Sequence, residues 1–205
     1  MRASSLLTLL TVLALTGCAS VPEVHYYMIG RPAGIGAAAE PLSSTGLTIG
    51  VPRFEAEGIY ARDNLLYRSG EHEIAVDYYR RWGTPVQKML AETTVGYLRS
   101  SGSFAGVLRL PSMSRVDLVL AGRILRFEHI PEAVGSHVRV DFEFCLKNPA
   151  NHSILWRMEL SETATAGVAP SAEVLVAAYE TCIHSCLKRA VDAVAQEAAK
   201  YSSQQ

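Results

Sequence analysis

Apolar and polar side chains alternate in two adjacent stretches of the chain. Between residues 137 and 147, Val138, Val140, Phe142, Phe144 and Leu146 follow a strict period of two. After the turn residues 148–151, Ile154, Trp156, Met158 and Leu160 also alternate. A period of two is typical of strands with one buried and one polar face. We therefore predict two long strands joined by a turn, with a third long strand before them over residues 116–130.

The first third of the chain predicts shorter strands. Residues 24–29 are rich in aromatic and β-branched side chains, and residues 47–51 alternate up to Pro52. Residues 65–68 and 72–79 flank Ser69-Gly70, a pair typical of a tight turn. This region is predicted to form a hairpin.

Two helices are indicated by their end signals and by helical spacing. Thr84 stands before Pro85, and Gln87 completes the pattern of a capping box, so a helix is predicted from Thr84 to about residue 101, before Gly102. We expect Trp82 to be a core residue that fixes the entry to this helix. A second helix is predicted over residues 171–200, where the following apolar residues share one face: Val176, Tyr179, Ile183, Cys186, Leu187, Ala190 and Val194.

These elements predict an α+β fold with a single domain. Strands that are neighbours in the chain pair most readily with one another, so the sheet is expected to be mainly antiparallel. The two helices are expected to pack on one of its faces. The sequence shows no internal repeat and no second hydrophobic core.

The N-terminal segment has the pattern of a secretory signal. Residues 6–15 form an apolar run behind Arg2, and a run of ten residues is too short to span a bilayer. The run leads into Leu15-Thr16-Gly17-Cys18, which resembles the bacterial lipobox, so Cys18 is the predicted lipidation site. We therefore predict a signal peptide at 1–17, a lipidated tether at 18–24 and the folded domain at 25–205. Ala19 follows the cysteine where Asp would indicate retention at the inner membrane, so outer-membrane anchoring is expected.

The charge balance excludes some partners. The chain has 19 Lys and Arg against 20 Asp and Glu, with a net charge of −1. A general nucleic-acid binder needs a basic surface to displace counterions, so we expect no nucleic-acid partner.

The sequence contains partial motifs for catalysis or cofactor binding, but the residues around them do not fit these functions. Residues 34–39 match a loose dinucleotide-binding pattern, but Pro41 interrupts the helix that the pattern requires. His72-Glu73 begins like a zinc-protease motif, but Val76 stands where the second histidine belongs. We found no nucleophile elbow or phosphate loop, so no catalytic residue and no cofactor are predicted.

Cysteines and a histidine gather on the second predicted helix. Cys182 and His184 would point about 160° apart on a helix, so they cannot share a metal ion and no metal site is predicted. The periplasm permits disulfides, and Cys145 lies on a neighbouring strand. On a strand, however, Cys145 would lie on the opposite face from Phe142 and Phe144. Whether Cys145 pairs with Cys182 or Cys186 stays open at this point.

Several short motifs occur in an order that resembles one known family. They are Cys18 of the lipobox, Tyr26-Tyr27, Ile49-Gly50-Val51-Pro52, Leu66-Tyr67-Arg68, Arg81-Trp82, Leu120-Ala121-Gly122-Arg123-Ile124, Phe127-Glu128 and the apolar C-terminal helix. Nearly the whole chain after the signal resembles the ABC-type transport auxiliary lipoproteins that accompany MCE-protein lipid transport systems. Gly83-Thr84-Pro85 departs from the Ala-Glu-Pro expected after the Trp.

The resemblance implies a non-catalytic, periplasm-facing subunit at the outer membrane. It would dock an MCE-domain transporter component that carries phospholipids or other apolar molecules, and it is expected to form a homo-oligomer. Two alternatives remain open. One is an envelope-assembly lipoprotein serving pilus, lipopolysaccharide or peptidoglycan machinery, and the other is a lipid-tethered periplasmic hydrolase.

Overall fold

The computed structural model describes residues 22–30 and 45–204. The predicted signal peptide, Cys18 and the glycine-rich pattern at 34–39 lie outside these residues. Within them the strands are β1 (His25–Tyr27), β2 (Thr48–Val51), β3 (Glu55–Ala56), β4 (Asn64–Arg68), β5 (Ile74–Trp82), β6 (Gly106–Arg109), β7 (Leu118–Ile130), β8 (Ser136–Lys147) and β9 (Ile154–Gly167). The helices are η1 (Gly58–Ala61), α2 (Val86–Ser100) and α3 (Ala172–Ser202).

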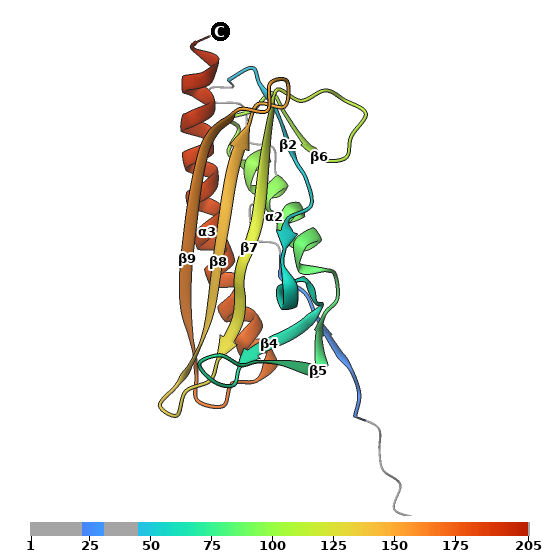
Figure 1. Cartoon of the computed structure of the whole chain (residues 1–205), viewed down its shortest axis with the longest axis vertical. Coiled ribbons are helices and arrows are strands. Elements are labelled where there is room, and N and C mark those ends of the chain that lie inside the picture. The colour runs from blue at the N-terminus through green and yellow to red at the C-terminus, as the bar shows by residue number, and fades with distance from the viewer. Residues whose placement is uncertain (1–21, 31–44, 205) are drawn as a thin grey trace, which may run out of the picture.

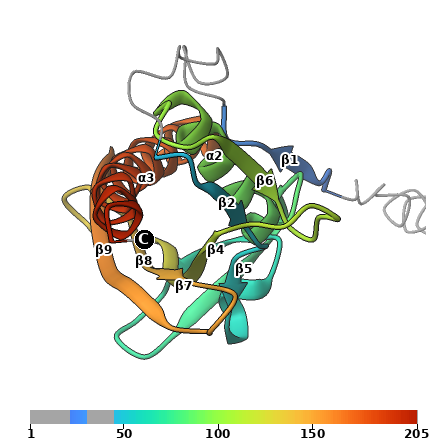
Figure 2. The ribbon, with the colours of Figure 1, turned by 90° about the horizontal axis from the view of Figure 1, so that it is seen from above.

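The strands form one curled, mixed sheet, and the two long helices close its open side (Figures 1 and 2). The long ladder β7–β8–β9 and the hairpin β4–β5 are antiparallel, as predicted. Strand β7 also pairs in parallel with β2, β3 and β4, and β1 and β6 extend the sheet through parallel pairs. The predicted α+β class with two helices is confirmed, and the parallel pairs are an addition that local alternation did not predict.

The core fills the inside of the curl. Phe142, Phe144 and Leu146 of β8 are fully buried, and every residue of the predicted apolar face of α3 is buried opposite them. Burying a side chain of this size stabilises the fold by roughly 1.5–3 kcal/mol. The alternation read from the sequence therefore assigned the inward face of β8 correctly.

Trp82 lies in this core, as expected. Its ring packs edge-on against Tyr179 at 5.3 Å and against Phe127 at 5.6 Å, and only 3% of the residue is exposed. Phe127 and Tyr179 are themselves stacked at 4.5 Å. This aromatic cluster joins β5, β7 and α3 where α2 begins.

The predicted capping box of α2 is wrong. Pro85 is the N-cap residue, and no side chain caps this end of the helix. The Gln87 side chain donates to the Ala61 carbonyl and accepts from Arg53, so it holds two distant loops. Because Gln87 is buried between these partners, it is not free to turn back toward Thr84. The predicted end is correct, since α2 stops at Ser100 and Gly102 has a φ of 63°.

A β-bulge in β7 reverses its alternation. Ile124 pairs with Phe142 and Arg126 pairs with Asp141, which leaves Leu125 as an extra residue. Phe127 can then face the core, and Glu128 points to the other face of the strand. Without the bulge, the carboxylate of Glu128 would lie among the core aromatic rings.

Candidate functional site

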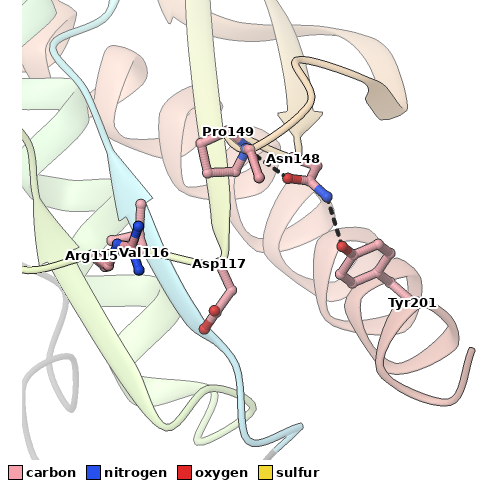
Figure 3. A pocket seen from close by; sticks show the side chains of 7 residues that line it. Arg115, Val116, Asp117, Asn148, Pro149 and Tyr201 are labelled. Atoms are coloured by element: carbon pink, nitrogen blue, oxygen red, sulfur yellow. Dashed lines mark hydrogen bonds between the residues drawn. The ribbon is translucent and has the colours of Figure 1, made fainter. Parts of the chain in front are cut away.

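A hollow lies at the end of the molecule where α3 finishes (Figure 3). Its volume is about 560 Å³. It is lined by Arg115, Val116 and Asp117 before β7, by Asn148, Pro149 and Ala150 of the β8–β9 turn, and by Tyr201 of α3. Three segments far apart in the chain therefore build one wall each.

Most polar groups of the hollow are already bonded within the chain. The Asp117 carboxylate accepts from the Thr48 backbone N–H at 2.7 Å. The Asn148 amide donates to the Tyr201 hydroxyl at 2.7 Å, and its oxygen accepts from Ala150 N–H (Figure 3). These bonds fix the β8–β9 turn against the last turn of α3. Arg115 is exposed and takes part in none of these bonds, so the hollow offers a shaped surface with a cation at its edge.

The described cysteines are buried, free thiols. Cys182 and Cys186 face the core, and burial raises the pKa of each thiol to about 12. A thiol with such a pKa stays protonated near neutral pH and is a poor nucleophile. Cys145 lies on the face of β8 opposite Phe144 and beside Glu143 and Lys147. The sheet therefore separates Cys145 from both helix cysteines, which settles the pairing question against a disulfide in this structure.

His184 points away from the two cysteines of its helix. Its ring lies 5.8 Å from the Tyr97 ring, between α3 and α2. Burial lowers the pKa of this imidazole. Among residues 22–30 and 45–204, no three His, Cys, Asp or Glu side chains are placed to hold a metal ion.

Two of the sequence motifs meet around a buried carboxylate. Arg68 of β4 forms a bidentate ion pair with Glu128 of β7, with two N–H donors that each lie 2.9 Å from a carboxylate oxygen. The Tyr60 hydroxyl donates to the same carboxylate at 3.0 Å, and burial together with this carboxylate raises the pKa of Tyr60. Arg126 approaches it at 3.6 Å. Sequence reasoning noticed Leu66-Tyr67-Arg68 and Phe127-Glu128 separately, but nothing in their spacing showed that they touch.

The motif around Gly122 also has a structural cause. The Phe54 ring lies so close to Gly122 that a Cβ built there would stand 2.4 Å from a ring carbon. Phe54 in turn packs edge-on against Phe144, the residue paired with Gly122 across the ladder. Glycine is needed here because the ring occupies the place of a side chain.

Comparison with protein families gives the chain its identity. The model of the ABC-type transport auxiliary lipoprotein component matches residues 32–191. This chain belongs to that family. No curated protein sequence matches the chain.

Solved structures share the fold of this family member. A crystal structure of a protein from Xanthomonas campestris superposes with a TM-score of 0.70 at 19% identity, covering 91% of this chain and all of that one. A second crystal structure, of an uncharacterised protein, has a TM-score of 0.56 at 14% identity and covers 89% of this chain and 98% of that one. At these identities the likeness shows the fold alone.

In the part of the chain that the structure describes, no helix combines the length and the hydropathy needed to cross a bilayer.

Proposed function

We propose that this chain is a non-catalytic docking subunit of an MCE-type ABC transport system, held at the outer membrane by acyl chains on Cys18. The observation that carries the proposal is the family match over residues 32–191, directly downstream of a lipobox. The cargo would be phospholipids or other apolar molecules that cannot cross the periplasm unaided. The protein would face the periplasm and hold the distal end of the transporter.

The arrangement of the two ends of the molecule supports this proposal. Strand β1, which follows the tether, lies at the opposite end of the sheet from the Asn148–Tyr201 hollow (Figure 1). Strand β8 has 12 residues, so these ends are roughly 40 Å apart. A domain tethered through β1 would therefore present the hollow toward the periplasm, where an MCE-domain partner would arrive.

A homo-oligomer would be consistent with the position of β9 at the edge of the sheet, next to α3. This strand has 14 residues and pairs only with β8 among the described residues. An unpaired edge of this length offers backbone donors and acceptors to another strand. Light scattering of the detergent-solubilised protein measures whether copies assemble.

Anchoring is tested with Cys18→Ser. Loss of the thiol should abolish acylation and leave uncleaved precursor, because the thioether to the lipid forms on this sulfur. Metabolic labelling with an alkyne fatty acid, read together with gel mobility, measures both effects. Normally sized, acylated Cys18→Ser protein in the membrane fraction contradicts the assignment, and Cys145→Ser is the matched control.

Partner identity is tested by crosslinking from defined positions. A photoreactive amino acid at Arg115 should capture an MCE-domain protein in intact envelopes, because this residue borders the hollow. The same group at Tyr78, at the opposite end, should not. Recovery of only pilus, lipopolysaccharide or peptidoglycan enzymes would favour the envelope-assembly alternative instead.

A further inference from the structure

Exposed apolar side chains occur at the end of the molecule where the described chain begins. We call Tyr78, Val134, Val168 and Val174 the tether-end surface. Val134 is 94% exposed, Val168 is 71% exposed and Tyr78 is 67% exposed. Exposed apolar side chains that lie in one region often mark an interaction surface.

The topology brings these residues together. Val134 lies in the β7–β8 turn, and Val168 follows β9 directly. These two loops are neighbours because Ser136 pairs with Gly167 and its hydroxyl donates to the Gly167 carbonyl at 2.8 Å. Val174 is in the first turn of α3, which starts at the same end. Figure 1 shows both loops and the β4–β5 hairpin at the bottom of the molecule.

Strand β1 adds the start of the domain to this end. His25 pairs with Arg80 and Tyr26 pairs with Arg81, so β1 lies beside the part of β5 that follows Tyr78. Six residues, 19–24, separate Cys18 from His25. Fully extended, they span at most about 21 Å. The tether therefore keeps β1 within that distance of the lipid headgroups.

We propose that the tether-end surface rests on the headgroup layer of the membrane, with the long strands standing away from it. The inference rests on the acylation of Cys18 in the proposed function and adds the orientation of the domain and the residues that contact lipid. Tyrosine suits this place, because its ring enters the apolar boundary while its hydroxyl stays hydrated. The occupant of the surface is thus the membrane that carries the anchor.

Charges at this end favour a zwitterionic lipid surface. Glu71 and Glu73 lie in the β4–β5 turn, and Glu132 lies in the β7–β8 turn. Anionic lipids repel these carboxylates and attract the guanidinium groups of Arg80 and Arg81, which lie near Tyr78 on β5. This mixture of charges favours lipids that carry no net charge. Vesicles of phosphatidylethanolamine and phosphatidylcholine are therefore the appropriate probe.

The test measures which end of the acylated protein lies near lipid. A fluorophore is attached through Glu71→Cys at the tether end or through Ala150→Cys in the β8–β9 turn, and the vesicles carry a nitroxide on their headgroups. The native thiols described above are buried, so labelling is directed to the new cysteine. Quenching should be several-fold stronger at position 71, because the two positions are separated by the length of β8.

A second pair of variants tests the contact itself. Val134→Ser with Val168→Ser should lower quenching at position 71 toward the level at position 150. Met113→Ser with Ile154→Ser, which removes exposed apolar groups away from the tether-end surface, should leave it unchanged. Circular dichroism verifies that each variant is folded.

Three results would overturn the proposal, and they are distinguishable. Equal quenching at both positions, or no effect of the Val134 and Val168 changes, shows a domain that hangs from its tether without lying on lipid. Strong label-to-label coupling at position 71 with weak lipid quenching assigns the surface to a second copy of this chain. Failure of the protein to float with vesicles overturns the anchoring itself, and the orientation falls with it.

Discussion

At the scale of single residues, the buried Glu128 carboxylate explains two of the sequence motifs. It is 0% exposed, and Arg68, Tyr60 and Arg126 all direct donors at it. A buried charge is tolerated only when it is paired and hydrogen-bonded. The ion pair thus explains both motif residues, because the buried carboxylate of Glu128 needs a cation and Arg68 supplies it. Together with Tyr60, the pair holds β4 and η1 on β7.

Removing the arginine should expose that dependence. We expect Arg68→Ala to destabilise the domain by about 3 kcal/mol, because Glu128 stays buried with only the Tyr60 hydroxyl and the more distant Arg126 cation beside it. Arg157→Ala should cost less than about 1 kcal/mol, since its pair with Glu143 spans 3.9 Å and the arginine is 54% exposed. Urea unfolding followed by Trp fluorescence measures both. Similar midpoints for the two variants would contradict the assignment.

At the scale of elements, the two helices begin in different ways. Ser171 caps α3, because its hydroxyl accepts from the Val174 N–H at 3.4 Å. Helix α2 starts at Pro85 without a side-chain cap, and its entry is held by Trp82 and Gln87 in the core. The first turn of α2 is therefore positioned by tertiary packing.

Alanine substitutions distinguish a helix start that is held by a side-chain cap from one that is held by packing in the core. Ser171→Ala should cost about 1 kcal/mol, which is typical for the loss of an N-cap side chain. Thr84→Ala should change the free energy of unfolding by less than about 0.5 kcal/mol, because no cap bond is lost. Thermal or urea denaturation of the two variants side by side makes the comparison. A larger loss for Thr84→Ala would restore the capping box.

At the scale of the whole molecule, two half-buried histidines link stability to pH. Burial lowers the pKa of His184, and burial followed by the nearby Arg80 cation lowers the pKa of His129. The pKa of each imidazole is lower in the folded state than its value of about 6.5 in an unfolded chain. The unfolded state therefore binds more protons between these two values. The resulting stability is present above about pH 6.5 and is lost as the pH falls through the folded pKa.

The expected outcome is a urea midpoint that declines as the pH is lowered from 7 to 5. The decline should be shallower in His129→Gln with His184→Gln, because neither glutamine titrates. His72→Gln changes an exposed side chain and serves as the control. An unchanged slope in the double variant would show that carboxylates alone set the pH dependence.

The sequence by itself determined the long local elements. Strict alternation assigned the buried face of β8, helical spacing assigned that of α3, and the hairpin was read from Ser69-Gly70. These patterns are legible because each element must present one apolar face to the core, whatever its partner. The order of short motifs was also sufficient to predict the family.

Tertiary structure alone decided the parallel pairs around β7, the bulge at Leu125 and the grip of Arg68 on Glu128. Each depends on residues far apart in the chain, so no local period encodes it. Gln87 shows the reason most clearly. Its spacing from Thr84 fits a capping box, but the buried Gln87 amide donates to the Ala61 carbonyl and accepts from Arg53 instead, and both partners come from segments distant in the chain.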